Sequence, residues 1–225
     1  MTKAVRTTVF FVLSLFFVCN AWAGEEFNKA IAKSFLTGLL RFWWLIALAI
    51  GFFILREYLR SPKVKGKIGE KVTDLGLKLT LDPKTYKILN DITIKDSKGK
   101  TQIDLVVVSR YGIFVIEVKN FNGWIFGNER DKYWTQVLYS KKTKFYNPLR
   151  QNHRHVKALA EVLKVDKKAI YSVVFFVGDV EFKTPMPANV INSGLSGYIK
   201  KFRKTYFTDD EVENIVRLLK KANIS

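Results

Sequence analysis

Residues 35–55 form an apolar stretch in which Arg41 is the only charged residue. About 20 apolar residues are long enough to cross a bilayer as a helix, and a helix in a soluble core is seldom apolar over such a length. Trp43 and Trp44 are typical of the aromatic belt at a membrane interface, and the Arg41 side chain can extend toward the same headgroups. The sequence therefore predicts a transmembrane helix over residues 35–55.

The segment before this stretch has the three parts of a secretory signal peptide. In residues 1–23, Lys3 and Arg6 supply a basic start, residues 9–18 supply an apolar centre, and residues 21–23 are an Ala-Trp-Ala cleavage pattern. The apolar centre is short for a membrane span. We therefore expect a cleaved signal and a single-pass protein. The alternative is that the segment is retained as a first membrane helix, which makes the protein two-pass.

A cluster of basic residues follows the apolar stretch and fixes the expected orientation. Its members are Arg56, Arg60, Lys63, Lys65 and Lys67. Basic residues beside a membrane span mark its cytoplasmic side. Both alternatives for residues 1–23 leave residues 61–225 on that side. We expect a bacterial inner-membrane protein with a cytoplasmic domain over residues 61–225.

Most of the positive charge belongs to this expected cytoplasmic domain. The whole chain has a net charge of +18, and residues 61–225 contribute 31 basic and 17 acidic residues, a net charge of +14. Such an excess predicts an anionic partner, which is either DNA or anionic lipid beside the anchor. The lysines that we select as candidate DNA contacts are Lys141, Lys142, Lys144, Lys200, Lys201 and Lys204.

The apolar pattern of residues 61–225 alternates between helical and strand periods. An early helix is predicted by apolar residues at helical spacing, which are Ile68, Val72, Leu75 and Leu79. Strands are predicted at 86–94, 102–109, 113–119, 123–127, 133–139 and 169–177, and helices at 147–163, at 193–203 and after Thr208. This order of elements predicts an α/β domain with a mixed sheet that is flanked by helices.

Charged residues interrupt two of these strands, which a short turn joins into a hairpin. Side chains alternate between the faces of a strand, so Glu117 and Lys119 share one face, and pairing of residues 102–109 with 113–119 brings Asp104 close to them. Two neighbouring carboxylates can bind Mg²⁺, and an adjacent lysine can stabilise charge on a phosphoryl oxygen. The alternative is a structural ion pair between Glu117 and Lys119.

Two helices can contribute to the same site. Glu70 supplies a third carboxylate if the first helix of the domain packs over the hairpin. Gln151 and His155 are four positions apart and therefore share one helix face. The alternative for His155 is an ordinary histidine on the helix surface. With only two histidines, and with Cys19 as the single cysteine, the chain cannot form a multi-histidine centre or a disulfide framework.

The spaced motifs of this region resemble those of the nuclease-related domain family, called NERD. The motifs are KGKIGEKV, TQIDLVVVSRYGIFVIEVKNFNGWIFG, W-x-Q and NPLRQNHRH. The resemblance covers about residues 65–163. Since this family is assigned to the PD-(D/E)xK nuclease-like superfamily, the resemblance implies a restriction-endonuclease-like fold with a mixed sheet flanked by helices.

The resemblance also implies a site and a reaction. The implied site comprises Glu70, Asp104, Glu117, Lys119, Gln151 and His155, and the metal ligands among them are Asp104, Glu117 and Glu70. The implied cofactor is Mg²⁺ or Mn²⁺, and the implied reaction is hydrolysis of DNA at the inner face of the membrane. One alternative is a catalytically silent scaffold that binds DNA or a partner. Another is a protein whose basic charge serves only anionic lipid.

Overall fold

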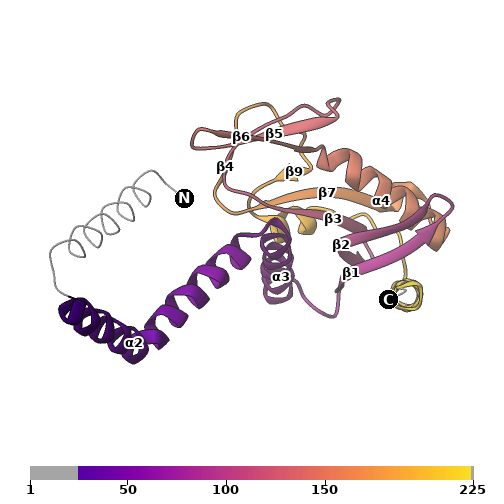
Figure 1. The fold of residues 1–225 in the computed structure, drawn as a ribbon. Helices are drawn as coiled ribbons and strands as arrows, with labels where there is room; N and C mark the ends of the chain where they lie inside the picture. Colours follow the sequence, from indigo (N-terminus) through magenta and orange to yellow (C-terminus); the bar gives the residue numbers. More distant parts are fainter. Residues whose placement is uncertain (1–24, 224–225) are drawn as a thin grey trace. The chain divides into compact units, whose positions relative to one another are not determined.

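The computed structural model describes residues 25–223 (Figure 1). The expected signal peptide, residues 1–23, lies outside this range. The chain divides into two compact units, and the second begins at Arg60.

Helix α2, Glu25–Arg60, carries apolar side chains that are widely exposed. Phe35 is 63% exposed and Phe52 is 70% exposed. No single helix among residues 25–223 is long and apolar enough to cross a membrane, although residues 29–38 and 43–59 pass that test together as a pair bent by 55°. The uninterrupted membrane helix that the sequence predicted over residues 35–55 is not found, because the bend falls inside this range.

The second unit is built around a central five-stranded sheet. Its strands are β1 (Tyr86–Asp96), β2 (Gly99–Ser109), β3 (Gly112–Asn120), β7 (Ile170–Val177) and β9 (Val190–Ile191), in the order β1-β2-β3-β7-β9. The predicted hairpin is confirmed, since β2 and β3 pair antiparallel with Val106 opposite Val115. Strands β3, β7 and β9 pair in parallel, so the sheet is mixed.

Helices cover both faces of the central sheet. They are α3 (Pro62–Thr80), α4 (Pro148–Leu163), α5 (Leu195–Lys200) and α6 (Asp209–Ala222), with the short 3₁₀ helix Lys167–Ala169 before β7. Helices α4 and α6 share one apolar cluster with the sheet, and α3 and α5 share another. The predicted capping box at the start of α6 is confirmed, because the Thr208 hydroxyl accepts from the Glu211 N–H and the Glu211 carboxylate accepts from the Thr208 N–H.

A second sheet, which the sequence did not predict, lies beyond the end of β3. Its strands are β4 (Gly123–Phe126), β5 (Tyr133–Leu138), β6 (Lys141–Tyr146) and β8 (Val180–Phe182), in the order β6-β5-β4-β8. Gly123 lets the chain leave the central sheet, since its φ is 89° and a Cβ atom there would lie 2.4 Å from the Val137 carbonyl oxygen. The fold is therefore α/β with two mixed sheets flanked by helices, where a single sheet was expected.

Helix α3 turns a different face to the sheet from the one expected. The predicted apolar face is exposed by 44% to 78% at Ile68, Val72, Leu75 and Leu79. Thr73 and Leu77 are buried instead. The reason is close packing at Gly69, where a Cβ atom would lie 2.7 Å from the Asn120 Cβ atom. The helix approaches the sheet where it carries its smallest side chain.

Candidate active site

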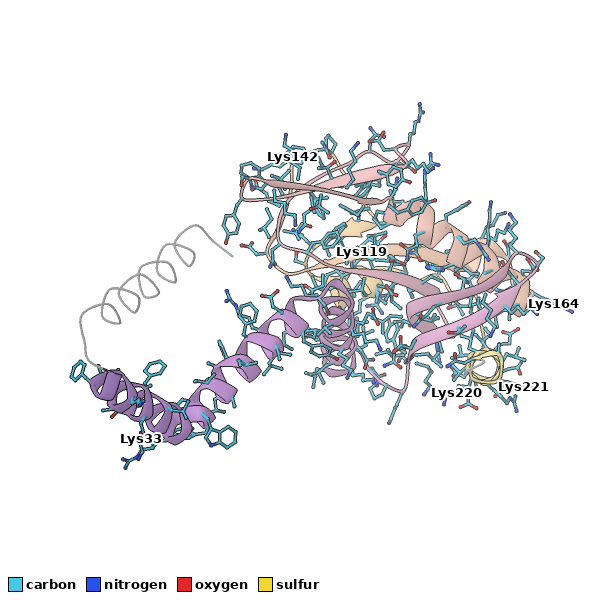
Figure 2. All side chains as sticks on the ribbon, viewed as in Figure 1. Lys33, Lys119, Lys142, Lys164, Lys220 and Lys221 are labelled. Atoms are coloured by element: carbon cyan, nitrogen blue, oxygen red, sulfur yellow. The ribbon has the colours of Figure 1, made fainter. Side chains whose placement is uncertain are left out.

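Glu117 and Lys119 stand at the end of β3 and project toward α4. The Lys119 Nζ donates to Glu117 Oε1 at 2.6 Å and to Gln151 Oε1 at 3.1 Å. The Glu117 side chain is 1% exposed, and that of Lys119 is 20% exposed. Figure 2 labels Lys119 on this strand. The structure therefore brings together the strand pair and the first of the two predicted α4 residues.

His155 reaches the same carboxylate from the next turn of α4. Its Nε2 atom lies 3.2 Å from Glu117 Oε2, and its Nδ1 atom lies 2.9 Å from the Thr101 hydroxyl oxygen. A neutral imidazole with its proton on Nε2 donates to Glu117 and accepts from Thr101. His155 is buried, so the alternative of a surface histidine is wrong. Both oxygens of Glu117 are thus engaged, one by Lys119 and the other by His155.

Asn152 holds α4 against the strands that carry the site. It is fully buried, and its Nδ2 atom donates to the Val115 carbonyl at 2.8 Å and to the Val173 carbonyl at 2.9 Å. These acceptors lie on β3 and β7. The contacts fix the helix turn from which Gln151 and His155 extend, so Asn152 positions the site without touching it.

Asp104 occupies the point where β2 and β3 separate. The last paired residues of the hairpin are Leu105 and Ile116, and the next residue of β2 is Asp104. Its Oδ2 atom accepts a hydrogen bond of 2.8 Å from the Val118 N–H. The carboxylate of this β2 residue thus replaces a main-chain oxygen of β2 as the acceptor for a β3 N–H, which holds Asp104 beside Glu117.

The surroundings of Asp104 favour its protonated form. Burial, followed by the negative charges of Glu117 and Glu70, raises the pKa of Asp104 to about 7. The hydrogen bond from Val118 and the charge of Lys119 act in the opposite direction. The dominant effect is desolvation of the carboxylate, so a positive ion at this place would be strongly favoured.

Glu70 is brought to the site by the close packing of α3 on the end of β3. The Asn120 Nδ2 donates to the Lys65 carbonyl at 2.7 Å, one turn before Glu70. Burial raises the pKa of Glu70, followed by the charges of Asp91 and Glu117. Helix α3 therefore packs over the β2–β3 hairpin, which is the arrangement that a third carboxylate from Glu70 requires.

Asp91 is a further acidic residue beside this cluster, and the sequence analysis missed it. It lies on β1 opposite Asp104, because Asn90 pairs with Leu105 and Ile92 pairs with Ile103. Its φ is 52°, which is uncommon for a residue other than glycine. The Gln102 Nε2 donates to Asp91 Oδ1 at 2.8 Å. The available signal was a single acidic residue between the apolar residues of a predicted strand.

The donor set fits a hard divalent cation chemically. The oxygens of Asp104, Glu117 and Glu70 are the ligand type that Mg²⁺ prefers, and a cation would relieve the repulsion that helps to raise the pKa of Asp104. Within residues 25–223, no group of three or more His, Cys, Asp or Glu side chains is already placed to hold a metal ion. Both Glu117 oxygens accept hydrogen bonds, so Glu117 must give up at least one of these hydrogen bonds in order to bind a metal ion.

The lysines expected to contact DNA lie on two different parts of the second unit. Lys141, Lys142 and Lys144 lie on β6 and are exposed, and Figure 2 labels Lys142 there. The other group, Lys200, Lys201 and Lys204, lies at and after the end of α5. The Lys200 Nζ donates to the Thr80 carbonyl at 2.8 Å and thereby caps the end of α3. Lys200 therefore has a structural contact of its own.

Sequence comparison relates this chain to known proteins. The profile of the nuclease-related domain, NERD, matches residues 65–177. An uncharacterized protein of Bacillus anthracis is 35% identical over 168 residues, which is 72% of this chain and 79% of that protein. The structure of Pyrococcus furiosus SfsA in complex with Ca²⁺ matches at 14% identity and a TM-score of 0.27. The match covers 72% of this chain and 55% of that one. The first two matches show that this chain belongs to the nuclease-related domain family.

Proposed function

We propose that the protein is a metal-dependent nuclease that hydrolyses phosphodiester bonds of DNA, with a site of the PD-(D/E)xK kind. The observation that carries the proposal is the Lys119 amine, which is held between Glu117 and Gln151 at 2.6 and 3.1 Å. Asp104 stands beside this pair, fixed by the Val118 N–H. Carboxylates that can hold a divalent cation, with a lysine beside them, suit phosphodiester hydrolysis, because positive charge stabilises the negative charge that develops on the phosphoryl oxygens.

Each side chain has a role that follows from its contacts. Asp104, Glu117 and Glu70 would hold Mg²⁺ or Mn²⁺, which would supply Lewis-acid chemistry for attack of water on the phosphodiester. Lys119 supplies a positive charge for the developing phosphoryl charge.

The two α4 residues act through the strand residues. Gln151 orients the Lys119 amine through its Oε1 atom. His155 keeps the Glu117 carboxylate in one orientation through its Nε2 atom, and the Thr101 hydroxyl holds the imidazole ring in turn. Gln151 and His155 are therefore positioning residues in this scheme.

A cleavage assay on the full chain in detergent tests the proposal. Plasmid DNA and linear single- and double-stranded DNA are incubated with the protein and with Mg²⁺, Mn²⁺ or EDTA. A matched variant, Glu213→Gln, removes an exposed acid from α6 and controls for the loss of one negative charge. We expect metal-dependent cleavage that Glu117→Gln abolishes and Glu213→Gln retains. Cleavage in EDTA, or an unchanged rate in Glu117→Gln, contradicts the proposal.

One observation favours the alternative of a catalytically silent scaffold. Both oxygens of Glu117 already have partners in Lys119 and His155, as they would in a purely structural cluster. The scaffold predicts DNA binding that weakens steeply with salt. It also predicts no cleavage by the folded protein with either metal, and the same assay distinguishes the two functions.

We also propose that α2 anchors the protein at the bacterial inner membrane, with residues 61–225 on the cytoplasmic side and anionic lipid beside them. Exposed apolar side chains on α2, such as Phe35 and Phe52, support this, because a large exposed apolar surface is typical of a site that contacts a membrane or another protein. Membrane fractionation of a C-terminally tagged chain, followed by a carbonate wash, tests the proposal. Release of the protein into the wash contradicts anchoring. Protease treatment of spheroplasts tests the orientation, and we expect the C-terminal tag to be protected.

A further inference from the structure

The second sheet has an inner face and an outer face of different character. Ile125 and Trp134 are fully buried and pack with Phe176 of the central sheet. Their strand neighbours point the other way and remain exposed. The exposed fractions are 49% for Trp124, 36% for Phe126, 51% for Tyr133 and 44% for Tyr146. We call this outward surface, defined by Trp124, Phe126, Tyr133 and Tyr146, the aromatic face.

The strand register places lysines on the aromatic face. Two rows of paired residues cross the sheet, Trp124–Val137–Lys142 and Phe126–Thr135–Lys144. Directly paired residues point to the same side of a sheet, so Lys142 and Lys144 lie on the same side as the rings, with β5 between them and the β4 rings. Tyr133 and Tyr146 are also paired, with ring centroids 6.1 Å apart in an edge-to-face arrangement. Aromatic rings and lysine side chains thus share one surface of the sheet.

The charge of the aromatic face is positive. The Lys183 Nζ lies 4.7 Å from the centroid of the Trp124 ring, and the Lys132 Nζ lies 5.4 Å from that of Tyr133. Glu181 pairs with Trp124 across β4 and β8, and its carboxylate is bound by Lys183. The one acidic residue in these rows is therefore neutralised by a neighbouring lysine.

The tip of the β5–β6 hairpin extends this surface. Tyr139 is 95% exposed and has a φ of 55°. A bulky residue in the left-handed region is uncommon, and a ring that is almost fully exposed gains no stability from burial. Such features are found where a residue serves a function. Lys141 and Lys142 follow after Ser140, and Lys142 is labelled at this hairpin in Figure 2.

We propose that the aromatic face binds single-stranded nucleic acid. Unpaired bases stack on exposed aromatic rings, and lysines between the rings hold the phosphates. A duplex offers no free base faces to such rings, so the aromatic residues select the single-stranded form. This deepens the proposed function by naming the form of its substrate, and it rests on that function only for the fate of the bound strand.

The aromatic face is directly connected to the candidate active site. Strand β4 begins at Gly123, shortly after Lys119 at the end of β3. Asn147, which caps α4 one turn before Gln151, donates to the Asp131 carbonyl at 2.7 Å in the β4–β5 connection. In Figure 1 the chain passes from β6 into α4. The strands that carry the aromatic face therefore adjoin, along the chain, the two elements that supply Lys119 and Gln151.

Fluorescence anisotropy on the full chain in detergent and EDTA measures this binding without cleavage. The probes are a labelled 20-nucleotide single strand and the duplex of the same sequence. Trp124→Ala and Tyr146→Ala remove rings, Trp124→Phe restores one, and Leu218→Ala is a control for an exposed apolar residue on α6. We expect each ring removal to weaken single-strand binding about tenfold. We expect Trp124→Phe to recover most of this loss. The affinity of the ring variants for the duplex, and the affinity of Leu218→Ala for the single strand, should change by less than about twofold.

The outcomes separate this proposal from its competitors. Equal losses for the single strand and the duplex, or no loss in folded variants, overturn it. So does a change in sedimentation that shows Trp124→Ala disrupting a dimer while DNA affinity is unchanged, because the face is then an interface between copies. If the ring variants behave as expected and Mg²⁺ produces no cleavage, the nuclease proposal fails while the binding proposal stands.

Discussion

Glu117 shows how the chain keeps a buried charge at the centre of its domain. The carboxylate is 1% exposed and accepts hydrogen bonds from Lys119 and His155. A charge that is buried without such partners would cost several kcal/mol. The closeness of Glu117 and Lys119 could be predicted from the sequence, because residues two apart on a strand share a face. Thr101 could not be predicted as a partner of His155, because only the packing of α4 against β2 brings the two side chains together.

Lys119→Met tests this balance of charge. The variant leaves Glu117 buried with a single partner, and we expect a loss of about 3 kcal/mol in the free energy of unfolding. Urea unfolding of the full chain in detergent measures it. The double variant Glu117→Gln/Lys119→Met removes the stranded charge and is expected to recover part of the loss. A Lys119→Met protein as stable as the wild type contradicts the account.

Asp104→Asn tests the cost of the partly buried Asp104 negative charge in the absence of metal. Because the pKa of Asp104 is raised from 3.8 to about 7 in the folded state, its stabilising contribution is complete below pH 3.8 and is lost as the pH rises through 7. We therefore expect Asp104→Asn to be more stable than the wild type at pH 8, by at most about 4 kcal/mol. Thermal melts in EDTA should show this advantage vanishing near pH 4. A variant that is less stable than the wild type at pH 8 is the contrary result.

Among the elements, α4 and the β2–β3 hairpin were predicted well and α3 and β6 were not. The hairpin has strong strand composition and a short turn, and α4 begins with an Asn-Pro cap, so local signals sufficed. Strand β6 was missed because its lysines give no apolar alternation, as is common at exposed sheet edges. The face of α3 was predicted wrongly because Gly69, which sets the packing, contributes nothing to an apolar pattern.

Gly69→Ala tests how α3 brings Glu70 to the site. The added Cβ atom meets the Asn120 Cβ atom at 2.7 Å, so the helix or Asn120 must move. We expect a loss of about 1–3 kcal/mol in unfolding free energy, together with weaker metal-dependent cleavage. Gly76→Ala on the same helix is the matched control, because no atom lies within 4 Å of its added Cβ atom. That control should gain up to about 1 kcal/mol. Equal effects of the two substitutions rule out the packing argument.

The ion pair between Asp96 and Arg154 ties the end of β1 to α4 and gives a pH-dependent test. The Arg154 Nη2 donates to Asp96 Oδ1 at 2.8 Å, and this bonding lowers the pKa of Asp96. A lowered pKa contributes stability above pH 3.8 that is lost as the pH falls through the lowered value. Asp96→Asn should therefore be less stable than the wild type at pH 7, and the two proteins should converge in acid. A difference in melting temperature that is the same at pH 7 and at pH 2.5 contradicts this.

At the scale of the whole molecule, residues beyond the motif core complete the fold. The sequence motifs cover about residues 65–163, yet β8 and β9 finish the two sheets, and α5 and α6 cover the faces of the central one. The family and the α/β class were predictable from spaced motifs and periodicity. The second sheet was not, because it depends on the backbone at Gly123, where φ is 89°. Asp91 was missed for a similar reason, since its place opposite Asp104 depends on the register of β1.

The central claim is that the cluster around Glu117 hydrolyses DNA with a divalent cation. The most direct measurement is the initial rate of plasmid cleavage by the full chain as Mg²⁺ or Mn²⁺ is raised from zero. The comparison proteins are Glu117→Gln and the control Glu213→Gln. We expect a rate that saturates with metal, falls at least about a hundredfold in Glu117→Gln and is unchanged in Glu213→Gln. No metal-dependent cleavage by protein shown to be folded, or equal rates in the two variants, would contradict the claim.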